Sequence, residues 1–246
     1  MEDWKKQGQG STEASLLERP DETTREIRRA IEALFEPGDV VELRALKDRT
    51  TASGYFDEHE ELAEQAASLD GRGFAVYVTL NPPKPALLSR AHNRLKHHPK
   101  ATTSDADILR RRWLPVDFDP VRPADVSSTD EEKRAALLRA REVRDHLRDQ
   151  GWPEPILGDS GNGAHLLYRV DLPNDRESQE LVKGILEALA FRFSDEVVMV
   201  DTSPCNAARI WKCYGTVARK GDNTEVRPHR TSRLLKVPDK AEACSL

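Results

Sequence analysis

The chain has 246 residues, of which 37% are hydrophobic and 33% are charged, and its formal net charge at pH 7 is −5. The composition is typical of a globular protein with a hydrophobic core, and the length suits one catalytic domain with an appendage. The acidic charge argues against a protein that coats nucleic acid by bulk positive charge. No apolar run approaches the roughly 20 residues of a membrane helix, and the polar N-terminus lacks a secretory signal, which predicts a cytoplasmic protein without a membrane partner.

The N-terminal region is predicted to be a polar leader followed by a helix. Residues Met1 to Pro20 are polar and contain Gly and Ser, which favours a flexible leader. Over 21–35, Ile27, Ile31 and Leu34 recur at helical spacing, so we expect a helix that docks on the domain. The expected organisation is a leader and docking helix over 1–35, a catalytic domain over 36–238 and a tail over 239–246.

Short apolar segments alternate with helical patterns along the rest of the chain. The segments are rich in β-branched and aromatic residues, which favours strands. They are Val40–Leu46, Phe74–Leu80, Trp113–Phe118, His165–Val170 and Val197–Val200, and Ala208–Val217 is expected to continue the sheet. The helical patterns are Glu58–Leu69, Asp130–Gln150 and Ser178–Phe193. Such alternation predicts an α/β sandwich rather than a helix bundle or an all-β barrel.

Charge is distributed unevenly along the sequence. Basic residues gather in 90–100, 110–112 and 219–233, whereas 58–64 and 130–132 are acidic. A locally basic groove on an acidic protein suits an enzyme that holds phosphates and also concentrates metal ions on carboxylates.

Three scattered cysteines, Cys205, Cys213 and Cys244, indicate neither a disulfide framework nor a standard zinc site. A zinc site that combines Cys205, Cys213 and His229 is the alternative to ordinary reduced thiols.

The first chemical motif is an acidic pair at the end of a strand. In Val116-Asp117-Phe118-Asp119-Pro120, the two carboxylates project to the same side because side chains alternate along a strand. Two adjacent carboxylates repel unless a cation lies between them, so the pair is a candidate ligand for magnesium or manganese. A surface turn is the alternative interpretation.

The second motif is the glycine-rich loop from Gly158 to His165. Gly161 and Gly163 allow the backbone to approach a ligand, and backbone amides together with the Ser160 hydroxyl can bind phosphate oxygens. His165 begins the next strand and would point at the same place. The alternative is a simple hairpin turn.

The third motif is an apolar strand over 197–200 that ends in Asp201, which either completes a metal site or caps a loop. Beyond it, Arg209, Lys220 and the basic cluster 227–233 could clamp a triphosphate or a template backbone. Ordinary surface charge is the alternative for each of them.

In this order, the three motifs resemble those of the archaeo-eukaryotic primase superfamily, specifically its primase-polymerase domains. That family has a D-x-D or D-x-E after an apolar strand, an S-x-H or S-x-x-x-x-H loop, and an apolar strand that ends in Asp. Here the three motifs are VDFDP, SGNGAH and MVD. The likeness continues through YVTLNP, RRRWLPVDFDP and DTSPCNAARIWKCYGT into RPHR, and covers about residues 36–236.

The resemblance implies a fold and a set of residue roles. The fold would be α/β (α+β), with an RNA-recognition-motif-like sheet packed against an N-terminal α/β unit, helices flanking mixed sheets, and the active site in the cleft between them. Asp117, Asp119 and Asp201 would be catalytic and would bind two Mg²⁺ or Mn²⁺ ions, with no zinc expected. The nucleotide would be held by Ser160, Gly161, Asn162, Gly163, His165, Arg209 and Lys220, and nucleic acid by Asn206, Arg227, His229 and Arg230.

The expected activity is therefore a template-dependent nucleotidyltransferase, a DNA primase or polymerase that works by two-metal phosphoryl transfer. Its partners would be a single-stranded DNA template, a primer strand and ribonucleoside or deoxyribonucleoside triphosphates. A replicative helicase would join them in trans or on a longer parent chain. Primer initiation and primer extension are both open at this point.

Two other function classes compete with this prediction. A non-catalytic module that binds single-stranded nucleic acid would display aromatic residues for base stacking, and aromatic residues are only 6% of this chain. A metal-dependent nuclease also uses clustered carboxylates. Metal-dependent incorporation of labelled nucleotide on a primed template separates the polymerase from both.

Overall fold

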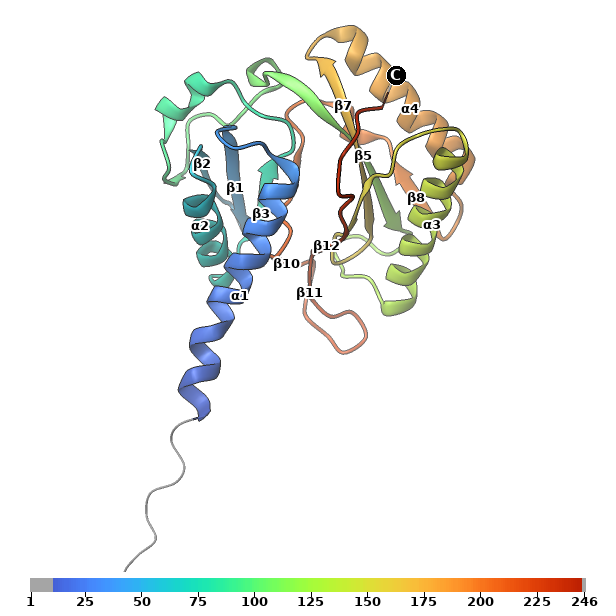
Figure 1. Ribbon diagram of the computed structural model, residues 1–246. Helices are drawn as coiled ribbons and strands as arrows, with labels where there is room; N and C mark the ends of the chain where they lie inside the picture. Colours follow the sequence, from blue (N-terminus) through green and yellow to red (C-terminus); the bar gives the residue numbers. More distant parts are fainter. Residues whose placement is uncertain (1–10, 245–246) are drawn as a thin grey trace, which may run out of the picture.

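Two antiparallel sheets dominate the structure, a computed structural model that describes residues 11–244 (Figure 1). The N-terminal sheet has the strand order β4-β2-β1-β3-β9. Its strands are β1 (Val41–Lys47), β2 (Thr50–Phe56), β3 (Ala75–Thr79), β4 (Lys96–His97) and β9 (Ile210–Lys212). Because β9 comes from the C-terminal part of the chain, a distant segment completes this sheet.

The second sheet has the strand order β12-β6-β7-β5-β8. Its strands are β5 (Arg110–Pro120), β6 (Ile156–Asp159), β7 (Ala164–Pro173), β8 (Val198–Asp201) and β12 (Arg233–Lys236). A separate small ladder joins β10 (Val217–Ala218) to β11 (Arg230–Thr231). Short 3₁₀ helices span Pro85–Arg90, Asp105–Asp107 and Ser203–Cys205.

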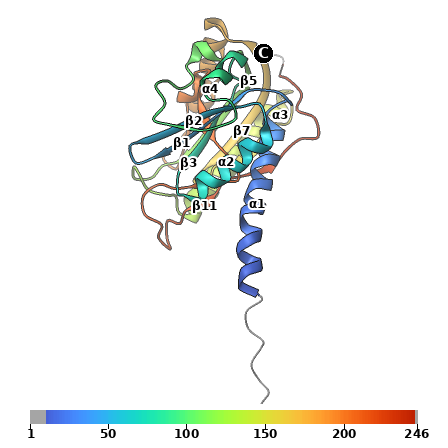
Figure 2. The ribbon, with the colours of Figure 1, turned by 90° about the vertical axis from the view of Figure 1, so that its left-hand side faces the viewer.

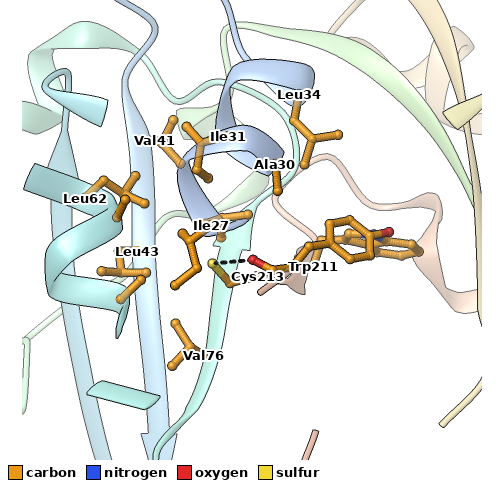
Figure 3. Close-up of a cluster of buried hydrophobic side chains, with 14 of the residues drawn as sticks. Ile27, Ala30, Ile31, Leu34, Val41, Leu43, Leu62, Val76, Trp211 and Cys213 are labelled. Carbon is orange, nitrogen blue, oxygen red and sulfur yellow. Dashed lines mark hydrogen bonds between the residues drawn. The ribbon is translucent and has the colours of Figure 1, made fainter. Parts of the chain in front are cut away.

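Helices α1 (Ser11–Leu34) and α2 (His59–Gly71) lie over one face of the N-terminal sheet (Figure 2). Ile27 and Ile31 of α1 pack against Leu43 and Val76 of the sheet (Figure 3). Burial of each such side chain contributes roughly 1.5–3 kcal/mol, so this face holds the helices in place. The first part of α1 projects away from the body (Figure 1).

Helices α3 (Asp130–Asp149) and α4 (Arg176–Phe193) cover one face of the second sheet. Helix α3 begins with a capping box, in which the Thr129 hydroxyl accepts from the Glu132 amide at 3.2 Å and the Glu132 carboxylate accepts from the Thr129 amide at 2.9 Å. Val116 and Phe118 of β5 are buried beneath these helices. The alternate residues of β5 therefore face the other way.

The opposite face of the second sheet contributes to the core of the N-terminal unit. Trp113, Ile156 and Leu167 belong to the same buried cluster as α1, and the Trp113 indole donates to the Leu34 carbonyl at 3.0 Å. Arg112 forms a buried ion pair with Asp39. The two units are therefore joined through a shared core.

Most of the predicted strands and helices are present with ends shifted by a few residues, and the coarse class of helices packed on sheets is confirmed. The expectation of mixed sheets is wrong, because every ladder between named strands within residues 11–244 is antiparallel. Neighbouring strands such as β1–β2 and β6–β7 are connected by hairpins, which need no crossover helix.

Other differences concern segments whose structure depends on packing. Helix α1 already runs over 11–20, which was predicted to be leader, and this stretch is rich in the good helix formers Glu, Ala and Leu; residues 1–10 lie outside the described range. The segment 208–217 is not one strand, because β9 joins the N-terminal sheet and the chain then turns at Gly215, where φ is +94°. Residue Cys244 of the expected tail donates its amide to the Arg169 carbonyl of β7 at 2.9 Å.

Across residues 11–244, none of the helices combines the length and the apolar character required to span a bilayer.

Candidate functional site

The three acidic residues lie on two adjacent strands of the second sheet. The register of β5 and β8 sets Asp117 directly opposite Asp201, and Asp119 follows two residues along β5. Residues opposite one another share a face of the sheet, as do residues two apart in one strand. All three carboxylates therefore project from the face that α3 and α4 leave uncovered.

His165 joins the carboxylates from the other side of β5. It pairs with Asp117 in the β5–β7 ladder, and its Nε2 lies 3.4 Å from Asp117 Oδ1. Its Nδ1 lies 2.7 Å from the Tyr214 hydroxyl, which also accepts from the Trp211 indole at 3.1 Å. Burial raises the pKa of Tyr214, so the hydroxyl keeps its proton and can donate it to Nδ1. This arrangement favours the tautomer in which Nε2 carries the proton and faces Asp117.

The glycine at position 158 makes room for Tyr214. Gly158 pairs with His165 across the β6–β7 hairpin, and a Cβ at Gly158 would lie 2.5 Å from the tyrosine hydroxyl. A side chain there would displace the group that orients His165. Gly158 belongs to the glycine-rich motif, but its role is to support the histidine rather than to approach a ligand.

The loop 160–163 is a hairpin turn and also part of the site. The Ser160 amide donates to the Gly163 carbonyl at 3.2 Å, and the Ser160 hydroxyl accepts from the Gly163 amide at 2.8 Å. This leaves the hydroxyl proton of Ser160 available to a ligand. The Asn162 side chain accepts from the Ser128 amide at 2.9 Å, which ties the loop to the start of α3.

Gly161 and Gly163 do not line the site. A Cβ at Gly163 would lie 2.2 Å from the Phe118 carbonyl of β5, and one at Gly161 would lie 2.6 Å from Ala218 of β10. Both glycines therefore allow close packing of the loop on neighbouring strands, and they are not among the residues that line the pocket described below.

A pocket of about 250 Å³ collects these side chains between the two sheets. The predicted residues that line it are Asp117, Asp119, Ser160, Asn162, His165, Asp201, Arg209 and Lys220. The polar and aromatic residues that the sequence analysis missed are Tyr77, Trp211, Lys212 and Arg219, all on the opposite wall or the segment after β9. One signal was available for Lys212, because a lysine interrupts an otherwise apolar run in IWKCY.

Lys212 is the most buried cation of the pocket, with a relative exposure of 9%. Its ammonium donates to the Val217 carbonyl at 2.9 Å and lies 5.7 Å from the centre of the Tyr77 ring. Burial lowers the pKa of Lys212 to about 8. Arg219 is already paired with Asp70 at 2.6 Å, whereas the exposed ammonium of Lys220 has no side-chain or backbone partner in the described part of the chain.

Each outer carboxylate has a cation nearby. Arg122 lies 3.4 Å from Asp119, and Arg209 lies 3.5 Å from Asp201. Burial raises the pKa of Asp119, and the negative charge of Asp117 raises it further. Asp201 also accepts from the Ser203 amide at 2.8 Å, so it caps the following turn while it faces the pocket.

The carboxylate oxygens are the ligand type that Mg²⁺ and Mn²⁺ prefer. As the side chains stand, no three His, Cys, Asp or Glu groups within 11–244 are drawn together tightly enough to hold one ion. An ion shared by the three aspartates would therefore require their side chains to move toward one another on this face of the sheet.

The four residues expected to contact nucleic acid lie outside the pocket lining. Arg227 makes two bonds of 2.8 Å to the Glu132 carboxylate, and Arg230 contacts Asp130 at 2.6 Å. These pairs hold β11 and the segment before it against the start of α3. The other two also bond to protein atoms, His229 to the Gly221 carbonyl and Asn206 to the Asp105 carboxylate.

The three cysteines are free thiols. Cys213 is buried in the core beneath α1, where burial raises the pKa of its thiol to about 12, so it is a neutral packing residue (Figure 3). Cys205 is not among the residues that line the pocket between the sheets.

Models of known protein families, curated protein sequences and solved structures were all compared with this chain, and none of them matches.

Proposed function

We propose that the chain is a template-dependent nucleotidyltransferase that adds nucleotides to a 3′-hydroxyl. One observation carries this proposal: a wall with three aspartates and a histidine faces a wall with a buried lysine across a single pocket. Metal-assisted phosphoryl transfer needs both, because the metal ions require oxygen ligands and the triphosphate requires cations. The resemblance of the three motifs to primase-polymerase domains supports the same chemistry.

Asp117, Asp119 and Asp201 are the residues that would hold two Mg²⁺ or Mn²⁺ ions. When bound, such ions lower the pKa of a primer 3′-hydroxyl and neutralise charge on the triphosphate. The β5–β8 register keeps the three carboxylates on one rigid face, so little of the binding free energy is lost in ordering them.

The remaining pocket residues position the nucleotide. His165 is held by Tyr214 so that its Nε2 proton can be donated to a phosphate oxygen beside Asp117. The Ser160 hydroxyl can donate to the same group. Lys212 and Lys220 supply positive charge to the triphosphate and offset the charge that develops on the leaving pyrophosphate.

Incorporation of labelled nucleotide on a primed template, with magnesium or manganese, tests the proposal. Asp117→Asn and Asp119→Asn should each abolish incorporation while the circular dichroism spectrum is unchanged. The matched control is Asp149→Asn, which removes one exposed carboxylate at the end of α3 and should retain full activity. Retained synthesis by both pocket variants would overturn the assignment.

The same reaction without nucleoside triphosphates separates the competing activities. Release of fragments from the template under those conditions would indicate a metal-dependent nuclease, and binding without either reaction would indicate a binding module. We place the proposed reaction in the cytoplasm, with a single-stranded DNA template and a primer strand as the partners that such synthesis requires. A replicative helicase, in trans or on a longer parent chain, is the further partner that we propose.

A further inference from the structure

A second pocket, of about 450 Å³, lies at the far edge of the N-terminal sheet, where β4 pairs with β2. Its polar lining consists of Tyr55, Arg90, Lys96, His97, His98 and Lys100, together with Ser53. Of the residues that the structure describes, none that lines this pocket carries a carboxylate side chain. This basic edge pocket therefore differs from the acidic pocket between the sheets, and its charge suits an anionic ligand.

Two cations of the basic edge pocket are available to a ligand. Lys96 and Lys100 are exposed, and neither has an ion pair or hydrogen bond from its side chain in the described part of the chain. Arg90, in contrast, is held in place by the Tyr55 hydroxyl at 3.2 Å and by Asp107 at 3.5 Å. The pocket thus has a fixed base and a rim of uncompensated charge.

The loop that presents these lysines is ordered by backbone contacts. The His98 amide donates to the Thr51 carbonyl at 2.8 Å, and the Asn93 side chain accepts from the Asp57 amide at 3.1 Å. The Arg94 carbonyl oxygen lies close to Gly54, and a Cβ built on Gly54 would be 2.1 Å from that oxygen. A loop fixed in this way presents its cations with little ordering cost on binding.

The basic edge pocket and the catalytic pocket lie on the same face of the N-terminal sheet. Strand pairing places Lys96, Ser53, Arg44, Tyr77 and Lys212 opposite one another in a single row from β4 to β9. Directly opposite residues share a face, and four strand spacings amount to about 19 Å. In the middle of this row, Arg44 is neutralised by the buried Glu42, which it contacts at 2.6 Å. Free positive charge is therefore concentrated at the two ends of the row.

We propose that the basic edge pocket binds the sugar-phosphate backbone of a single-stranded nucleic acid whose continuation reaches the catalytic pocket. This choice of ligand rests on the proposed function, because a template must be held beyond the reacting nucleotide. The Tyr55 ring is 2% exposed and cannot stack on a base, whereas the unpaired ammonium groups of Lys96 and Lys100 suit phosphate oxygens, so we expect binding here to depend on charge and on salt.

Anisotropy of a labelled single-stranded oligonucleotide, titrated with the intact chain at several salt concentrations, tests the inference. Lys96→Gln with Lys100→Gln should weaken binding by about tenfold and reduce the slope of log K against log salt by about 1.4, since each phosphate contact on a single strand contributes about 0.7. The matched control is Arg134→Gln with Arg141→Gln, which removes two exposed charges from α3 and should leave affinity and slope unchanged.

Three results would overturn the inference. They are unchanged affinity for the oligonucleotide in the lysine variant, an equal loss of affinity in the arginine control, or weaker binding of a free nucleoside triphosphate by the lysine variant with no change for the oligonucleotide.

Incorporation of labelled nucleotide is measured on the same preparations. If the wild-type chain fails to incorporate nucleotide but loses strand affinity on lysine replacement, the proposed function fails and the binding surface stands. If it incorporates nucleotide but strand affinity is unchanged, only the binding surface fails.

Discussion

The two walls of the pocket between the sheets differ in the charge that they carry. The second sheet contributes Asp117, Asp119 and Asp201, whereas the N-terminal sheet contributes Lys212 beside Tyr77. Carboxylates thus lie on one layer and a buried ammonium on the other. If the proposed function holds, a metal-bound triphosphate would contact both sheets, with the metal on the acidic wall and the phosphates on the basic wall.

The pKa values of charged residues on the two walls are also shifted in opposite directions. Burial and the charge of Asp117 raise the pKa of Asp119, and burial lowers the pKa of Lys212 to about 8. In both cases the charged form is disfavoured by its surroundings. A cation beside the aspartates and an anion beside the lysine would each relieve this cost, and replacements on the two walls should therefore have separable effects.

The largest effect on incorporation is expected from replacements on the acidic wall. Asp201→Asn should lower incorporation by on the order of a hundredfold or more, because one oxygen ligand loses its charge where the transition state needs it most. The concentration of Mg²⁺ needed for half-maximal activity should rise at the same time. A metal titration of incorporation checks both, and an unchanged metal requirement would remove Asp201 from the site.

A smaller and different effect is expected on the basic wall. Lys212→Met keeps the length of the side chain and removes its charge, so the KM for nucleoside triphosphate should rise by about tenfold, which corresponds to about 1.4 kcal/mol. The metal requirement should not move. Steady-state kinetics at several metal concentrations measure this, with Lys236→Met on the exposed surface as the control. If Lys212→Met shifted the metal requirement as much as Asp201→Asn does, the assignment of metal binding to the acidic wall and of triphosphate binding to Lys212 would be contradicted.

The charge of Lys212 also predicts a dependence on pH. Lysine is protonated below its pKa, so nucleotide affinity should decline as the pH rises through about 8, and Lys212→Met should lose this decline.

The folding stability of the chain should change with pH in the opposite direction. The pKa is lower in the folded chain than the usual 10.5, so the unfolded chain binds more protons between about 8 and 10.5, and the free energy of unfolding should rise over that interval. Denaturant titrations across this range measure it.

The smallest effect on incorporation is expected from Tyr214, which lies behind the acidic wall and contacts His165. Tyr214→Phe leaves His165 Nδ1 and the Trp211 indole without their partner, which should cost about 1–3 kcal/mol of stability and reduce incorporation only a few-fold. Tyr168→Phe is the control, because the Tyr168 hydroxyl is buried without a hydrogen-bond partner among residues 11–244 and its removal should be neutral or stabilising. Equal destabilisation by both variants would show that the hydroxyl of Tyr214 does not orient the histidine.

The sequence by itself determined the local features of this protein. The helical spacing of Ile27, Ile31 and Leu34 predicted α1, and alternation in VDFDP placed Asp117 and Asp119 on one side of a strand. These predictions depend on neighbouring residues, whose periodicity records which side of an element is buried.

Only the tertiary structure decided how distant segments meet. Nothing local indicates that Asp201 pairs with Asp117, that β9 leaves its sequence neighbours to complete the N-terminal sheet, or that Lys212 thereby faces the aspartates. Likewise, Arg227 and Arg230 resembled phosphate ligands in the sequence, yet they pair with the acidic start of α3. Strand order and ion pairing over long separations depend on the packing of the whole chain, because many pairings satisfy the same local pattern and the shared core selects one of them.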